Sequence, residues 1–168
     1  MNNPILYIMC GLAFSGKSTL ARKIAEHTSS KIVAFDKLWL EKEKEGPISK
    51  DANGWRFIRK VGQDRVADLL GEGESVVYDD NNVRFEHREE LREVARKYGA
   101  KEIVIYLNTP MQLIGERERI NRTTGERHEV DPVNFQKVVE QLEPPTSNEN
   151  FLEFTPDTNM VEFLNRLS

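Results

Sequence analysis

Cysteine is nearly absent from this 168-residue sequence, and apolar runs long enough to cross a membrane are absent altogether. The single cysteine, Cys10, excludes an internal disulfide and any zinc site built from cysteines. Apolar runs such as Ile103 to Leu107 have the length of one strand, far short of the roughly 18 residues that span a bilayer. Met1 to Pro4 has no positive charge of the kind that begins a signal peptide. These absences predict a cytoplasmic protein without membrane contact.

An excess of positive charge is also missing. Lys and Arg number 24 against 28 Asp and Glu, which gives a formal net charge of −4. Without a positive field to attract polyanions, a nucleic-acid partner is possible but not favoured. Hydrophobic residues make up 38% of the chain and charged residues 31%, as in a soluble globule, and the length suits one domain over residues 1–168. The sequence does not indicate an oligomeric state.

Short apolar runs alternate along the chain with segments of helical periodicity. A helix is expected after Asn82 with its stop at Gly99, another from about Trp55 to Leu70, and a third beginning at Pro110. Strands that alternate with helices predict an α/β fold with a parallel sheet covered by helices on both faces. Five buried strands are expected: Ile5 to Cys10, Lys31 to Phe35, Ser75 to Tyr78, Ile103 to Leu107 and Phe151 to Phe154.

The most specific signal is a phosphate-binding loop near the amino terminus. Gly11-Leu12-Ala13-Phe14-Ser15-Gly16-Lys17-Ser18 fits the pattern G-x-x-x-x-G-K-S, between an apolar strand and the helical stretch Thr19 to His27. A loop of this kind directs backbone N–H groups and a helix dipole at phosphate oxygens. Lys17 would add a positive charge, and the Ser18 hydroxyl would bind a magnesium ion shared with the nucleotide. The loop therefore predicts binding of ATP and Mg²⁺.

Other residues favour phosphoryl transfer over a switch or a motor. The chain has no Asn-Lys-x-Asp segment for a guanine base, and the run Val76 to Tyr78 ends in Asp79-Asp80-Asn81-Asn82 without the Glu of a hydrolytic ATPase. In a kinase the enzyme's main task is positioning and charge neutralisation. The sequence accordingly favours a kinase.

Two aspartates and one polar segment are candidates for the chemistry of such a kinase. Asp36 follows the second strand and is a candidate general base, although it could instead cap a helix that begins at Lys37. Asp79 ends the third strand and could hold magnesium through water or orient the acceptor, whereas Asp80 could be a plain turn residue. Residues 117–131 suggest a lid that brings arginines, and possible phosphate contact by His128, over the transferred group.

Together these features resemble the small P-loop kinases related to the polynucleotide kinase domain, a group that includes AAA_33-like ATP-binding proteins and, more loosely, chloramphenicol phosphotransferase and zeta-toxin kinases. The motifs that carry the resemblance are Gly11 to Thr19, Asp36, Asp79 to Asn82 followed by Glu86-His87-Arg88, Arg117 to Arg127, and Glu143 to Thr146. The resemblance implies a five-stranded parallel sheet of order 2-3-1-4-5 and transfer from ATP, with magnesium, to a hydroxyl. It also implies roles for individual residues: ATP contacts for Gly11 to Thr19, with Lys17 catalytic; Ser18 on the metal; Asp36 as base; Asp79 on the acceptor side; Arg122 as the lid arginine; and Thr155 to Thr158 near adenine.

The sequence departs from these relatives at two positions. Ala13-Phe14 replaces a small pair in the loop, and a positive φ would be costly at Phe14. Trp39 stands where polynucleotide kinase has an Arg, three residues after the base, which favours an apolar or ring-bearing acceptor over a phosphodiester.

The acceptor is expected in a cap of residues 37–60, where Trp39 and Arg56 are candidate contacts, although tryptophans more often close a core. Elsewhere, the row Arg84, Arg88, Arg92 and Arg96 is interleaved with acids and is interpreted as a solvated face, and Glu143 to Asn150 as a surface loop. The sequence thus predicts a kinase for a small-molecule hydroxyl, such as that of an antibiotic, nucleoside or sugar. A 5′-hydroxyl polynucleotide kinase, a toxin-like kinase and a non-transferring nucleotide-binding regulator remain as alternatives.

Overall fold

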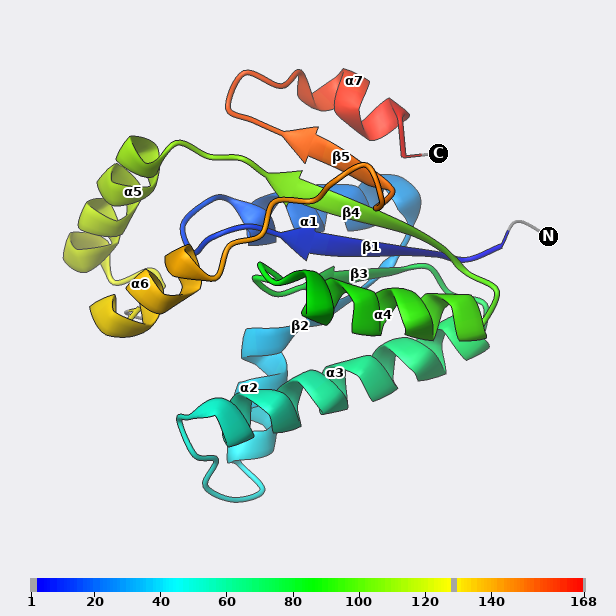
Figure 1. The fold of residues 1–168 in the computed structure, drawn as a ribbon, viewed down its shortest axis with the longest axis horizontal. Helices are drawn as coiled ribbons and strands as arrows, with labels where there is room; N and C mark the ends of the chain where they lie inside the picture. Colours follow the sequence, from blue (N-terminus) through cyan, green and yellow to red (C-terminus); the bar gives the residue numbers. More distant parts are fainter. Residues whose placement is uncertain (1–2, 128–129, 168) are drawn as a thin grey trace.

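The computed structural model describes residues 3–127 and 130–167 as alternating strands and helices (Figure 1). Their bounds, in chain order, are β1 Ile5–Cys10, α1 Lys17–Thr28, β2 Lys31–Ala34, α2 Phe35–Glu43, α3 Ala52–Gly71, β3 Val76–Asp79, α4 Phe85–Lys97, β4 Lys101–Leu107, α5 Met111–Thr124, α6 Pro132–Glu140, β5 Phe151–Phe154 and α7 Met160–Asn165.

All five strands are parallel and form one sheet of order β2-β3-β1-β4-β5. The register places Tyr7 of β1 between Val77 of β3 and Ile103 of β4, so β1 lies at the centre. Every strand therefore ends at the same edge, where the arrows point in Figure 1. The predicted α/β class and strand order are confirmed.

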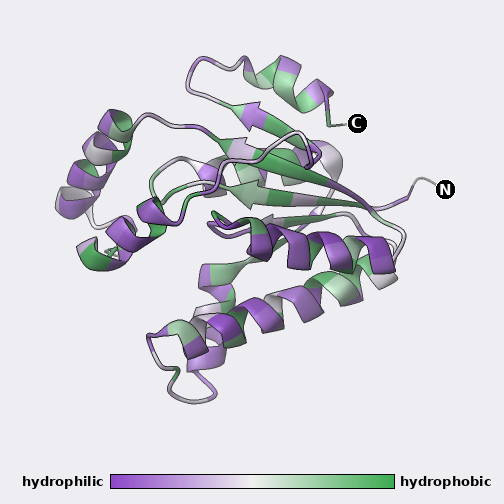
Figure 2. Cartoon of the chain, in the orientation of Figure 1, coloured by the Kyte–Doolittle hydropathy of each residue, from purple (hydrophilic) through white to green (hydrophobic). Residues whose placement is uncertain are grey.

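Helices cover both faces of the sheet, and each strand divides its side chains between them. Leu6, Ile8 and Tyr78 pack with α3 and α4 on one face, whereas Tyr7 and Met9 pack with α1 and the α7 segment on the other. Figure 2 shows the resulting pattern, with hydrophobic colour along the strands and hydrophilic colour on the outward sides of the helices. Strands with apolar residues on both sides are expected in a parallel sheet that is covered twice.

The two edge strands differ from the prediction of five buried strands. Lys31 and Ile32 of β2 are exposed, and β5 is only half-buried except for Glu153, which is exposed. An edge strand has one hydrogen-bonded neighbour, so one side stays open. The helix after β2 also begins earlier than predicted, at Phe35, so Asp36 lies in its first turn and the alternative role of Asp36 as its N-cap is wrong.

Two helices, α5 and α6, lie beyond the carboxyl edge of the sheet rather than on a face (Figure 1). The segment predicted as a lid is helical through Thr124, because α5 ends only at Gly125, whose φ is 63°. The sequence did not predict the short helices α6 and α7. Among the residues that the structure describes, no helix combines the length and the apolar character needed to cross a membrane.

Candidate active site

The loop between β1 and α1 has the geometry of a phosphate cradle. Gly16, the N-cap of α1, has φ 103° and ψ 10°, a left-handed conformation that costs glycine little. No side chain in the described residues caps this helix, and its first turn contains no acid. The first N–H groups of a helix have no partner within it, and they carry the positive end of its dipole. The start of α1 is therefore open to an anion.

Phe14 adopts the conformation that the sequence argues against. Its φ is 60°, a left-handed value unusual for a residue with a side chain. Its ring is 7% exposed and belongs to an apolar cluster with Leu12, Val83 and Ile114, against which the α6 residues Phe135, Val138 and Val139 pack. Burial of a phenylalanine contributes roughly 1.5–3 kcal/mol, which offsets a left-handed backbone cost of roughly 1–2 kcal/mol. Packing against α5 and α6 thus holds the phosphate loop in its strained conformation.

Lys17, the first residue of α1, is buried beside the phosphate loop. Its ammonium donates a hydrogen bond of 2.7 Å to the carbonyl oxygen of Leu12 in the same loop. Burial lowers the pKa of Lys17, and the nearby carboxylates Asp79, Asp80 and Asp36 act in the opposite direction. These charge interactions place the three aspartates that follow β2 and β3 around one lysine.

Asp80 is more than a turn residue. Burial raises the pKa of its carboxyl to about 6, while the backbone N–H of Asn81, at 2.7 Å, and the charge of Lys17 oppose that rise. Asp36 acts with burial, since its negative charge also disfavours ionisation of Asp80. Asp79, which the sequence singled out, ends β3 half-buried and has the largest charge effect on Lys17. Both aspartates belong to the site.

The segment after β3 forms hydrogen bonds with the start of the phosphate loop and with the end of β1. The N–H of Gly11 donates to the Asn81 carbonyl at 2.9 Å, and the Asn82 amide donates to the Met9 carbonyl at 2.8 Å. Asn82 has φ 44°, a conformation that asparagine tolerates better than most residues. The loops after the first and third strands are therefore tied together.

A buried ion pair extends this support to two other segments. Arg88 of α4 is fully buried and binds both carboxylate oxygens of Glu149, at 2.7 and 2.8 Å. Its remaining terminal nitrogen donates to the carbonyls of Asn82 and Val83 at 3.0 and 3.1 Å. The interpretation of the arginine row as a solvated face is thus wrong for Arg88, and the surface loop that contains Glu149 is anchored in the interior. Helical spacing alone cannot show which side of α4 faces the sheet edge.

The arginine that contacts the phosphate loop is Arg117. One of its terminal nitrogens donates to the carbonyls of Phe14 and Ser15, at 3.0 Å each. Arg122, the predicted lid arginine, is 61% exposed and pairs with Glu118 at 2.7 Å, beside a small pocket lined also by Phe14 and Asn121. His128 lies outside the described residues. The segment 117–131 was the sequence signal for Arg117, but it could not rank the arginines.

A cleft of about 590 Å³ opens next to the phosphate loop. Its walls come from the start of α5 and from the turn after β5, and it is lined by Asn108, Pro110, Gln112, Leu113, Glu116, Thr155, Pro156 and Asp157. Thr109, at its rim, donates from its hydroxyl to the Ser15 carbonyl at 3.0 Å. The cleft includes three of the four residues that the resemblance places near adenine.

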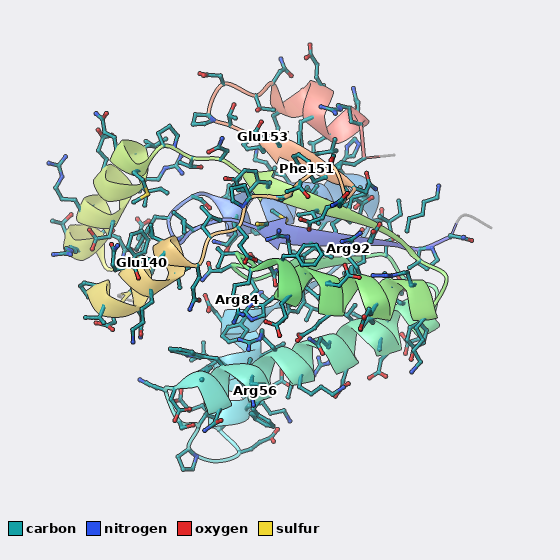
Figure 3. The ribbon with its side chains drawn as sticks, in the orientation of Figure 1. Arg56, Arg84, Arg92, Glu140, Phe151 and Glu153 are labelled. Atoms are coloured by element: carbon teal, nitrogen blue, oxygen red, sulfur yellow. The ribbon has the colours of Figure 1, made fainter. Side chains whose placement is uncertain are left out.

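The segment predicted as the acceptor cap, residues 37–60, forms most of α2 and the first part of α3. Trp39 is half-buried, with its ring centroid 6.2 Å from that of Phe35, and it packs against the main core. Arg56 is exposed on α3, toward the end of that helix nearest α2 (Figure 3). Arg59, one turn further along α3, is half-buried and acts on the charge of Asp80. Arg59 lies within the predicted cap of residues 37–60, but the sequence favoured Arg56 as the candidate contact.

The residues of the cradle fit a nucleotide with magnesium. The buried Ser15 hydroxyl has no hydrogen-bond partner within residues 3–127 and 130–167, and the Ser18 hydroxyl lies in the first turn of α1, half-buried. No group of three or more His, Cys, Asp or Glu side chains in the described ranges is arranged to hold a metal. Magnesium bound with a nucleotide needs few protein ligands, because phosphates and water complete its octahedron. Ser18 and Asp79 would supply the protein side.

A parallel sheet of this order with a phosphate loop after its central strand defines the class of P-loop nucleoside-triphosphate-binding proteins. Residues 6–145 match the model of the AAA domain family AAA_33, and the chain belongs to this family, which confirms the resemblance to small P-loop kinases. No curated protein matches the sequence.

Solved structures, among them two kinases, share the fold over nearly the whole chain. The Mycobacterium tuberculosis APS kinase CysC, in complex with AMPPNP and APS, is 17% identical with a TM-score of 0.74, over 99% of this chain and 96% of that one. A gluconokinase from Sinorhizobium meliloti 1021 is 21% identical with a TM-score of 0.67, over 99% and 95%. Chaetomium thermophilum Kti12, in complex with ADP-AlF3, is 16% identical with a TM-score of 0.77, over 96% of both chains.

Proposed function

We propose that this protein is an ATP-dependent phosphotransferase that moves the γ-phosphoryl group of ATP to a hydroxyl of a small molecule. The observation that carries the proposal is the juxtaposition of Lys17 in an open phosphate loop with Asp36 at the start of α2 and with Asp79 and Asp80 at the end of β3. The kinase folds named above support it, since their chains bind nucleotides or are named for phosphoryl transfer.

The chain's own residues divide the reaction between them. The acceptor oxygen forms a bond to the γ-phosphorus as the bond from that phosphorus to the ADP oxygen breaks. Asp36 takes the proton of the acceptor hydroxyl, while Lys17 and the N–H groups of the loop bind the phosphate oxygens. Ser18 with Asp79 would hold magnesium, which would supply charge neutralisation at the phosphates. Arg122 is proposed to act from the lid, and the cleft beside Thr155 to accept adenine.

The arrangement favours this function over a polynucleotide kinase. The net charge is −4, and Trp39 stands three residues after Asp36, where polynucleotide kinase has an arginine. A polynucleotide acceptor would require a continuous basic surface and would show steep salt dependence. A non-transferring nucleotide-binding regulator is the second candidate, because Kti12, which was solved with ADP-AlF3 and is not named as a kinase, shares this fold.

The test is an acceptor screen with ATP and Mg²⁺, scored by a mass gain of one phosphoryl group. We expect transfer by the wild type, none by Lys17→Ala, and ATP binding by Asp36→Asn with turnover slowed roughly 10²- to 10⁴-fold. Arg22→Gln, at an exposed position on α1, is the control and should keep wild-type rates. ATP binding without any acceptor-dependent ADP release would instead identify a regulator, and a fully active Asp36→Asn would exclude Asp36 as the base.

A further inference from the structure

Helices α3 and α4 run side by side in the same direction, and both begin near the carboxyl edge of the sheet (Figure 1). The Gln63 amide of α3 donates to Glu90 of α4 at 2.7 Å, which sets their relative position. One turn nearer the start of each helix, at i−4 and i−3 from this pair, stand Arg59 and His87. The two side chains therefore face each other across the seam between the helices, on the side of the acidic strand ends.

The positive charges of Arg59 and Arg84 both act on His87 at this point of the seam. The pKa of His87 is lowered to about 4; burial is the largest cause, the charges of Arg59 and then Arg84 act in the same direction, and Glu86 and Glu143 oppose them. Arg84 stands at the start of α4 (Figure 3), with its side chain 43% exposed and bound to Glu86 at 2.7 Å. Arg59 is half-buried and has no carboxylate within 4.0 Å in the described part of the chain.

Asp80 is not an ion-pair partner that neutralises the charge of Arg59. The charge of Lys17 acts more strongly on Asp80 than that of Arg59 does, so Lys17 is its main cationic neighbour. Arg59 thus acts on the charge of Asp80 without forming an ion pair with it in the described part of the chain. A guanidinium that is partly removed from water and lacks a partner favours a bound anion, and its planar donors suit a carboxylate or phosphate.

We propose that Arg59, with His87 and Arg84, forms a subsite for an anionic group on the acceptor, a carboxylate or a phosphate monoester, whose hydroxyl lies at Asp36. This inference rests on the proposed function and names its substrate class. The seam between α3 and α4 and the helix α1 lie on opposite faces of the sheet, so one acceptor can place its anion at Arg59 and its hydroxyl toward the nucleotide. The aspartates repel an anion elsewhere in the site, which fixes the acceptor's orientation.

The first experiment needs no knowledge of the acceptor. AMPPNP and Mg²⁺ are added to saturation to fill the phosphate loop, and inorganic phosphate or acetate is then titrated while the ring resonances of His87 are followed by NMR. The variant His87→Gln identifies these resonances among the three histidines. An anion bound at Arg59 stabilises the imidazolium, so we expect the pKa of His87 to rise as the anion binds. The phosphate and acetate arms separate the two anion chemistries.

Arg59→Gln should require at least a tenfold higher anion concentration for the same shift. Lys60→Gln removes one positive charge from the adjacent, exposed position of α3 and should behave as wild type. If Arg59→Gln does not fold, Arg59→Lys, which keeps the charge but loses the planar donors, should weaken binding. Unchanged His87 resonances, or an equal response in the Arg59 variants, would overturn the subsite. Failure of AMPPNP to bind at all would overturn the proposed function itself.

The second experiment uses the acceptors found by the screen. With an anionic acceptor, Arg59→Gln should raise its KM roughly 10- to 100-fold, as expected for loss of charge-assisted hydrogen bonds, and leave the KM of ATP unchanged. The same acceptor without its anionic group should show no such difference between wild type and variant. Preferred transfer to neutral acceptors, unaffected by Arg59→Gln, would leave the kinase assignment intact and exclude the anionic subsite.

Discussion

In the candidate site, burial has a larger effect than charged neighbours on the ionisation of individual side chains. Lys17, Asp79 and Asp80 lie close together, yet burial is the largest influence on both Lys17 and Asp80 and disfavours their charged forms. Such groups are stabilised in the charged state by a ligand of the opposite sign. A triphosphate with magnesium supplies both signs, so this cluster suits a nucleotide site better than a structural ion-pair network.

Asp80→Asn should stabilise the protein at high pH. The folded-state pKa of about 6 lies above the ordinary value of 3.8 for an aspartate, so the native state holds this proton more tightly than the unfolded state. The resulting stability is complete below pH 3.8 and is lost as the pH rises through about 6. This difference in pKa corresponds to at most about 3 kcal/mol in the free energy of unfolding. Asp80→Asn should therefore be more stable than the wild type by up to this amount at pH 8, and the advantage should disappear toward pH 4.

The measurement is the free energy of unfolding in urea at several pH values, compared with Asp68→Asn at an exposed position of α3. A benefit for Asp80→Asn that is the same at pH 4.5 and pH 8 would show that its carboxyl is not held neutral in the folded protein.

At the scale of elements, the phosphate loop is connected with helices α5 and α6 through Phe14. Its ring packs against Ile114 of α5 and the apolar side of α6, while Arg117 of α5 binds the carbonyls of Phe14 and Ser15. The loop and these two helices therefore share both apolar and polar contacts. A movement of α5 and α6 over a bound nucleotide must act on the loop that binds its phosphates.

Two substitutions at Phe14 separate packing from backbone strain. Phe14→Ala removes the ring but keeps a side chain at φ 60°, and we expect a loss of about 3 kcal/mol. Phe14→Gly also removes the ring but relieves the left-handed conformation, so it should be about 1 kcal/mol more stable than the alanine variant. Urea unfolding measures both, with Phe57→Ala at a half-exposed ring of α3 as control. An alanine variant as stable as the glycine variant would mean that Phe14 carries no strain.

At the scale of the whole molecule, segments far apart in the sequence converge beneath the phosphate loop. Arg88 joins α4 to Glu149 of the loop before β5 and to the segment after β3, which in turn binds the end of β1. Because Arg88 and Glu149 are both fully or nearly fully buried, each neutralises a charge that water does not reach. The geometry of the site thus depends on the correct closure of the complete sheet.

Glu149→Gln should destabilise the protein by about 3–5 kcal/mol, because it leaves the charge of Arg88 buried and unpaired. Replacement of both residues, as in Arg88→Met with Glu149→Leu, should recover much of this loss in urea unfolding. Glu153→Gln, at an exposed position of β5, tests the loss of a glutamate charge alone. A Glu149→Gln variant with wild-type stability would show that the pair is not essential to the fold.

Local pattern was sufficient for much of the architecture. The spacing of apolar residues predicted all five strands, and the loop motif between a strand and a helix depends only on consecutive residues. The ends of elements were less accurate, as at α2, because a helix can begin wherever tertiary contacts support its first turn. The helices α6 and α7 were not predicted, since short helices depend on packing more than on propensity.

The sequence by itself determined the α/β class, the phosphate loop and the aspartates at the strand ends, because these follow from periodicity and from the parallel order of the strands. Only the tertiary structure decided the surroundings of each arginine: Arg88 is buried with Glu149, Arg117 binds the loop, Arg122 pairs on the surface with Glu118, and Arg59 acts on the charge of Asp80. Arginines of equal chemistry differ only in their surroundings, and those surroundings come from residues distant along the chain.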